Sequence, residues 1–173
     1  LGKIKGFGFT FAEAMTQKIN FIRSFIIGLV IGILPGIGGG TSNLLAYAVA
    51  KSQSKTPEKF GTGVIDGVVA SETSNNASVG GAFLPLLTLG IPGDTVTAML
   101  LGGFMIHGVT PGPLLLTSHG NLVYAIFAAL IIAHIVMLVV EFWGLRIFIK
   151  ALDIPKYILL PIIISLCVVG AFG

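Results

Sequence analysis

Glycine-proline breaks interrupt two of the long apolar runs in this chain. The first run covers residues 19–34, breaks at 35–40 and resumes over 41–50. The second run covers 81–91 and breaks before Asp94. No part of either run reaches the roughly 20 residues that a helix needs to cross a bilayer. The pattern therefore predicts discontinuous or re-entrant helices at both breaks.

The other segments divide into helices and polar loops. Residues 122–145 form an uninterrupted apolar run, long enough for a complete span. The remaining expected elements are an interfacial helix over 1–18, an aqueous loop over 51–63, a broken crossing over 64–92, a short helix over 94–107 and a further helix from residue 157.

The composition extends this pattern to the whole chain. Apolar residues make up 54% of it and charged residues 10%, and the mean hydropathy is +0.99. A soluble domain carries about 25% charged residues, so this chain lacks the surface of a soluble protein. We expect an all-α, polytopic integral membrane protein, with residues 1–173 in one transmembrane domain. The first residues carry no signal pattern and the last end inside an apolar run, so we expect a part of a longer subunit.

The basic residues lie in bands along the chain. None occurs between Lys59 and Arg146, although four acids lie in that interval. A nucleic-acid-binding protein would gather its cations on one face, so no nucleic-acid partner is expected. Basic loops favour the cytoplasmic side, which predicts that residues 51–59 and 146–156 both face the cytoplasm.

Polar residues follow both breaks. Helices that restart after a break present N–H groups without partners and a partial positive charge. We expect Thr41, Ser42 and Asn43 to open one such helix, and Asp94 and Thr95 to open the other. These residue types cap helices, and capping alone would explain Asp94. Three glycines before Thr41 permit close approach, so this end suits a carboxylate or phosphate oxygen.

Two further patterns bear on packing and on the site. Glycines recur every four residues from Gly28 to Gly40, which predicts close packing of helix backbones. Residues 71–76 are all polar or charged within an apolar region, so some of them face a cavity, a partner or a re-exposed surface loop. A carboxylate inside a membrane costs about 2.5–3.5 kcal/mol, so Glu72 there needs a proton, a cation or several donors.

Five stretches together resemble the large membrane subunit of tripartite tricarboxylate transporters, the TctA family. They are residues 32–39, 51–63, 66–81, 85–94 and 107–113. The resemblance covers about residues 20–173 and matches the second of two homologous halves. It implies a multi-pass bacterial inner-membrane permease that imports tricarboxylates such as citrate, or related organic acids, by ion-coupled symport. It further implies a small membrane subunit and a periplasmic solute-binding protein as partners.

Inverted repeats place the substrate between two halves, so part of the site would come from the other half. Helix ends contribute only about 0.3–1 kcal/mol each, up to roughly 2, to holding an anion. We therefore expect a co-bound Na⁺ or H⁺, and no other cofactor or metal. Expected cation contacts are Glu72 and Asp94. Expected substrate contacts are Gly36, Gly38, Gly39, Thr41, Ser42, Asn43, Asn75, Asn76, Pro92, Gly93 and Thr95.

Two alternatives remain at this point. Asp66 and Asp94 could form the carboxylate pair of an intramembrane aspartyl-type enzyme, or the chain could be a structural or channel subunit. Other enzymatic motifs are missing from the sequence, which has no nucleotide-binding glycine loop followed by lysine. The three histidines are scattered and Cys167 is the single cysteine, so we expect no enzyme and no metal centre.

Overall fold

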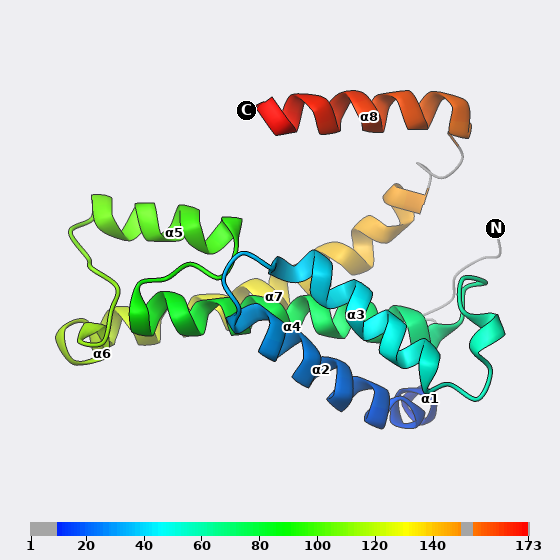
Figure 1. The fold of residues 1–173 in the computed structure, drawn as a ribbon, viewed down its shortest axis with the longest axis horizontal. Helices are drawn as coiled ribbons and strands as arrows, with labels where there is room; N and C mark the ends of the chain where they lie inside the picture. The colour runs from blue at the N-terminus through cyan, green and yellow to red at the C-terminus, as the bar shows by residue number, and fades with distance from the viewer. Residues whose placement is uncertain (1–9, 150–153, 173) are drawn as a thin grey trace. The chain divides into compact units, whose positions relative to one another are not determined.

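The computed structural model describes residues 10–149 and 154–172 (Figure 1). These residues form helices and connecting loops without a strand, which confirms the all-α prediction. The chain divides into two compact units, residues 1–123 and 124–173. The elements are α1 (Phe11–Thr16), α2 (Lys18–Ile33), α3 (Gly38–Ser52), the 3-10 turn η1 (Pro57–Lys59), α4 (Ile65–Leu89), α5 (Thr95–Ile106), α6 (Leu115–Ser118), α7 (Gly120–Phe148) and α8 (Lys156–Phe172).

The first unit is organised around helices α2, α3 and α4, which pack on one another (Figure 1). Their contacts are made mainly by small side chains and not by a large apolar core. Ser42, Ser74, Ala46 and Ala70 have no exposed surface at all. Small residues at helix contacts let the backbones approach closely, which is the packing typical of membrane helices.

The contact between α2 and α4 is so close that it excludes a methyl group at several positions. A Cβ on Gly28 would lie 2.2 Å from the Ser74 carbonyl oxygen, and one on Gly32 would lie 2.2 Å from the Ser78 oxygen. From the other side, a Cβ on Gly81 would lie 2.4 Å from the Leu29 oxygen. Such distances leave room for hydrogen only. We call this contact the glycine seam.

The predicted four-residue glycine stripe is therefore correct in its first half and wrong in its second. Gly28 and Gly32 pack against α4, but a Cβ on Gly36 or Gly40 would meet no atom within 4 Å. The stripe ends because α2 ends at Ile33, and the chain changes direction before Gly36. On the facing helix α4, Gly81 makes the corresponding close contact with the backbone of α2.

Helix α4 corrects the prediction of a broken crossing over 64–92. It runs without interruption for 25 residues, about 37 Å, with Pro85 inside it. The helix ends at Gly90, whose φ of +70° is left-handed, as glycine allows. The Gly90 N–H donates to Leu86 O at 3.0 Å, and the Ile91 N–H donates to Pro85 O at 3.2 Å. The break therefore follows the helix and does not divide it.

The start of α3 corrects a second prediction. The helix begins at Gly38 with Ile37 as its N-cap, so Thr41, Ser42 and Asn43 follow its first three residues and do not open it. The break covers residues 34–37 only. Glycine is a poor helix former, which is why its three-residue run suggested irregular backbone. Contacts with α4 override that preference.

Only part of the predicted interfacial helix over 1–18 can be compared, because residues 1–9 lie outside the described residues. Helix α1 occupies residues 11–16, and Thr10 and Glu13 form a capping box at its start. Hydrogen bonds from the main chain and hydroxyl of Thr10 hold the pKa of the Glu13 carboxyl below its usual value. The predicted aqueous loop begins after α3 ends at Ser52 and contains η1.

The second unit contains most of α7 together with α8, as the runs at 122–145 and from 157 predicted. Among the residues that the structure describes, the segment Gly120–Leu145 is the one helix both long and apolar enough to cross a membrane. The polytopic arrangement and the single transmembrane domain therefore stay predictions. Large apolar side chains such as Ile131, Trp143 and Leu166 are exposed on both helices of this unit.

Two neighbouring glycines test the glycine seam. Gly81→Ala places a methyl group against Leu29 O, and overpacking of this kind costs about 1–3 kcal/mol. Gly80→Ala is the matched control, because nothing lies within 4 Å of its Cβ and alanine favours helix by up to about 1 kcal/mol. We expect Gly81→Ala to lower the thermal unfolding temperature in detergent and Gly80→Ala to preserve or raise it. Equal unfolding temperatures for the two variants would contradict the seam.

Candidate functional site

The two breaks, 57 positions apart in sequence, are joined by a hydrogen bond. The Gly36 N–H donates to the Gly93 carbonyl oxygen at 2.9 Å. Gly93 is buried, and a Cβ on it would lie 2.7 Å from Gly32 O and 2.8 Å from the Ala82 Cα. After α4 ends, the chain folds back along it by about two turns, which brings Gly93 against Ala82. Gly93 therefore packs at the end of the glycine seam. We call this meeting point the break junction.

The first break needs glycine for its conformation. Gly36 and Gly38 have φ values of +79° and +68°, in the left-handed region that other residues rarely adopt. No side chain caps the N-terminus of α3. The N–H groups of Gly38, Gly39 and Gly40 belong to the first turn, where an α-helix offers them no partner of its own. These amides are available to a ligand or to water.

Asn75 of α4 lies directly over this first turn. A Cβ on Gly39 would lie 2.8 Å from Asn75 Oδ1 and 3.0 Å from Ser78 Oγ. Ser78 Oγ donates to the Asn75 carbonyl oxygen at 2.7 Å. The absence of a side chain at Gly39 therefore brings the Asn75 amide against the backbone of α3.

Asp94 approaches the same turn from the second break. The ideal Cβ position of Gly38 is 3.9 Å from the Asp94 Cβ. Asp94 caps α5, since its Oδ1 accepts from the Thr97 N–H at 2.8 Å and from Thr97 Oγ1 at 2.7 Å. The capping role that the sequence allowed for Asp94 is confirmed. Both bonds end on Oδ1, so the cap does not require Oδ2.

Ser42 serves helix packing. It has no exposed surface, and its hydroxyl donates to Gly39 O at 2.8 Å. Ser74 Oγ in turn donates to the Ser42 carbonyl oxygen at 3.0 Å, which ties α3 to α4. Asn43 is half-buried, and its Oδ1 is buried without a hydrogen-bond partner among the described residues.

Glu72, Asn75 and Asn76 share an exposed face of α4. Their spacing of i, i+3 and i+4 places them on one side of the helix, and all three are exposed. Asn76 Nδ2 donates to the Glu72 carbonyl oxygen at 3.0 Å. Glu72 therefore lies about one turn from the residue that covers Gly39.

The structure does not bring every predicted residue to the break junction. Thr41 is exposed and its Oγ1 donates to Ile37 O at 3.3 Å, while Thr95 is exposed at the start of α5. Pro92 is half-buried next to Gly93. The predicted site residues that do meet at the break junction are Gly36, Gly38, Gly39, Asn75, Gly93 and Asp94.

The proposed pair of Asp66 and Asp94 is not formed. Asp66 lies in the first turn of α4, sixteen residues before Ala82, which contacts the second break. Sixteen helical residues extend about 24 Å, so the two carboxylates are far apart. Within the described residues, no three His, Cys, Asp or Glu side chains gather as metal ligands would.

Two polar residues at the junction were not predicted from the sequence. Ser78 lies beside Asn75, and Thr97 completes the capping box of Asp94. The signal for Thr97 was its position three residues after an N-cap residue. The signal for Ser78 was its spacing of four from Ser74, opposite Gly28 and Gly32 at the same spacing.

Comparison with known proteins identifies the family. The model of the tripartite tricarboxylate transporter TctA family matches residues 2–173. This chain belongs to the TctA family. This assignment confirms the family that the sequence resembles. No solved structure matches the chain.

Two relatives from Agrobacterium vitis are similar over most of this TctA-family chain. An uncharacterized 52.8 kDa protein in the TAR-I ttuC′ 3′ region is 37% identical over 152 residues, which cover 88% of this chain and 30% of the relative. An uncharacterized protein in the TAR-II ttuC′ 3′ region is 37% identical over 138 residues, which cover 79% of this chain and 57% of the relative. The chain thus spans less than two thirds of either relative.

Replacement of Asp94 separates its capping role from its charge. Asp94→Ala removes the cap of α5, and such a loss costs about 0.5–2 kcal/mol. Asp94→Asn keeps an oxygen acceptor and should stay within a few tenths of the parent, since asparagine caps about as well. Thermal unfolding in detergent measures both, with exposed Thr95→Ala as the control. A similar loss in the Asn and Ala variants would show that the charge, and not the cap, stabilises this end.

Proposed function

We propose that this chain is part of the permease subunit of an ion-coupled, binding-protein-dependent importer of tricarboxylates or related organic acids. The carboxylate binds at the break junction. The observation that carries this proposal is the Gly36–Gly93 hydrogen bond, which joins the break after α2 to the break after α4 beside the uncapped start of α3. Paired helix breaks are where secondary transporters bind their substrates.

The groups at the junction suit a carboxylate. The first-turn N–H groups of α3 are donors without helical partners, and the helix dipole favours a negative charge there. Asn75 adds an amide that can donate two further hydrogen bonds. Gly38 and Gly39, which lie beside Asp94 and Asn75, carry no side chains, so a carboxylate oxygen can reach the backbone there directly.

A cation is required because no basic residue lies near these groups in sequence. Lys and Arg are absent between Lys59 and Arg146, while Asp94 and Glu72 are both there. Helix ends supply at most about 2 kcal/mol, too little to hold a multiply charged anion beside two acids. We therefore infer that Na⁺ or H⁺ binds with the substrate, close to Asp94 or Glu72. Uptake that persists when both sodium and proton gradients are removed would contradict this.

The exposed polar face of α4 supports a site that is shared with other parts of the transporter. Glu72, Asn75 and Asn76 cannot face lipid without a large cost. We propose that the remainder of the subunit covers this face and that the assembly lies in the bacterial inner membrane. A small membrane subunit and a periplasmic binding protein complete it.

Gly39→Ala tests the junction as the substrate site. The added methyl group displaces the Asn75 amide, and a hydrogen bond to a charged group is worth about 1.5–3 kcal/mol. We expect the affinity of the complete subunit for citrate or another carboxylate to fall by about tenfold or more. A thermal-shift titration with di- and tricarboxylates, with Na⁺ varied, measures it.

Gly40→Ala is the matched control for this titration. A Cβ on Gly40 meets nothing within 4 Å, and the residue lies in the same turn of the same helix. Its affinity should equal that of the parent. Equal affinities for the parent, Gly39→Ala and Gly40→Ala would exclude the break junction as the carboxylate site. The absence of any carboxylate-dependent shift in the parent would favour a structural or channel subunit.

A further inference from the structure

A polar cavity lies at the opposite end of α2 from the break junction. It has a volume of about 540 Å³ and is bordered by the start of α2, the loop after α3 and the start of α4. Arg23, one of its lining residues, lies ten residues before the end of α2, about 15 Å along the helix. The cavity is therefore separate from the proposed carboxylate site.

Arg23 is the fixed cation of this cavity. Its Nη1 donates to Gln53 Oε1 at 2.7 Å and its Nη2 donates to Asn20 Oδ1 at 2.5 Å. Asn20 is itself held, since its Nδ2 donates to the Asp66 carbonyl oxygen at 2.9 Å and to Gln17. Both acceptors of Arg23 are neutral amides, so these bonds position the guanidinium without neutralising it. An orientation fixed in this way suits the planar recognition of an oxyanion.

The charged residues that line the cavity have a net charge of one positive unit, because two are basic and one is acidic. They are Arg23, Lys55 and Asp66. The Asp66 Oδ1 accepts from Gln17 Nε2 at 3.3 Å. Ser54 and Thr56 add hydroxyl groups to the lining. A group with one negative charge and several acceptor oxygens complements this set, and a phosphodiester has both properties.

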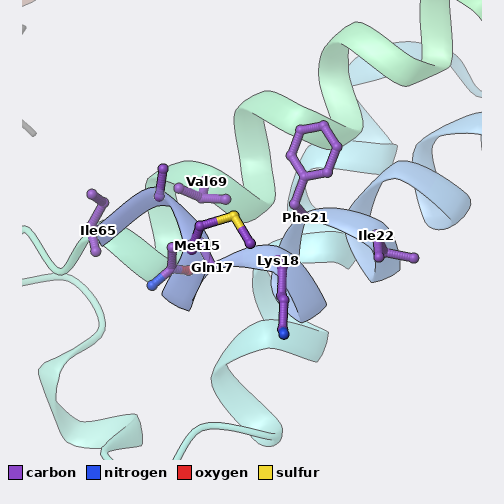
Figure 2. A pocket seen from close by; sticks show the side chains of 8 residues that line it. Met15, Gln17, Lys18, Phe21, Ile22, Ile65 and Val69 are labelled. Atoms are coloured by element: carbon purple, nitrogen blue, oxygen red, sulfur yellow. The ribbon is translucent and has the colours of Figure 1, made fainter. Parts of the chain in front are cut away.

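An apolar cavity at the same end of α2, on the other side of that helix, indicates where such a phosphodiester comes from. Figure 2 shows this cavity, of about 430 Å³, with Met15, Phe21, Ile22 and Val69 among its lining residues. Gln17 lines both cavities. Lys18 adds a further cation at the apolar one (Figure 2). A cationic polar cavity and an apolar one at the same end of α2 match a ligand with an anionic head and a hydrocarbon part.

We propose that the Arg23 cavity binds the phosphate of an anionic phospholipid. The last turn of α3 and the loop after it carry Lys51, Lys55 and Lys59, as expected for a segment at the surface of the cytoplasmic leaflet. Phosphate oxygens bind at Arg23 and Lys55, and part of the acyl region occupies the apolar cavity. The inference rests on the membrane placement under the proposed function, but it does not depend on which solute is carried.

Native mass spectrometry of the complete subunit with phosphatidylglycerol tests this site. Arg23→Gln should lower the retention of this lipid about tenfold, because it removes charge-assisted hydrogen bonds. Lys55→Gln should lower it about fivefold, because it removes one of the two cations that line the cavity. Lys55 is exposed, so its replacement leaves the helix packing intact even if Arg23→Gln does not fold.

Lys59→Gln is the matched control, because it removes the same charge from the same loop but does not line the cavity. Its lipid retention should equal that of the parent. Equal losses in Lys55→Gln and Lys59→Gln would show general surface attraction and overturn the site.

Retention of phosphatidylcholine equal to that of phosphatidylglycerol would show that the cavity does not recognise the lipid's negative charge, and would overturn the proposal. Full displacement by inorganic phosphate would assign the cavity to free phosphate. None of these outcomes bears on carboxylate binding, which the Gly39 and Gly40 variants test separately.

Discussion

The proposed site depends on one hydrogen bond between the two breaks of the first unit, from the Gly36 N–H to the Gly93 carbonyl oxygen. Each interruption frees backbone groups, and such groups are costly where no water can reach them. Pairing one break with the other satisfies one donor and one acceptor at once. It also fixes the start of α3 and the start of α5 next to each other, which is what a binding site between two helix ends requires.

The glycine seam makes this pairing possible. Gly28, Gly32 and Gly81 bring α2 and α4 into backbone contact, and Gly93 then fits between Gly32 and Ala82. A larger residue at any of these positions would separate the helices and move the second break away from the first. The same absence of side chains at Gly39 lets Asn75 lie over the amides of α3. Packing and the proposed chemistry thus use the same property of glycine.

Local sequence patterns predicted the helices, both breaks and the cap at Asp94, because these depend on neighbouring residues. They placed the start of α3 three residues late, since the low helix propensity of Gly38–Gly40 is overridden by contact with α4. They also predicted a broken crossing over 64–92, although α4 runs without interruption to Leu89. The Gly36–Gly93 pairing could not be predicted, because nothing local to either break specifies its partner 57 positions away. The glycines that exclude a side chain could not be distinguished from those that allow a turn.

A disulfide across the junction tests its geometry most directly. The ideal Cβ of Gly38 lies 3.9 Å from the Asp94 Cβ, within the range of about 3.5–4.5 Å that a disulfide spans. With exposed Cys167 replaced by serine, the pair Gly38→Cys and Asp94→Cys should cross-link under mild oxidation, as a gel-mobility shift reversed by reductant. The pair Gly40→Cys and Asp94→Cys should not, because Gly40 has no neighbour there. A cysteine at the left-handed φ of Gly38 is strained by about 1–2 kcal/mol, so the unfolding temperature of the reduced pair is measured as well. Failure to cross-link in a pair that unfolds near the parent, with both thiols still reactive toward a maleimide, would contradict the meeting of the two breaks.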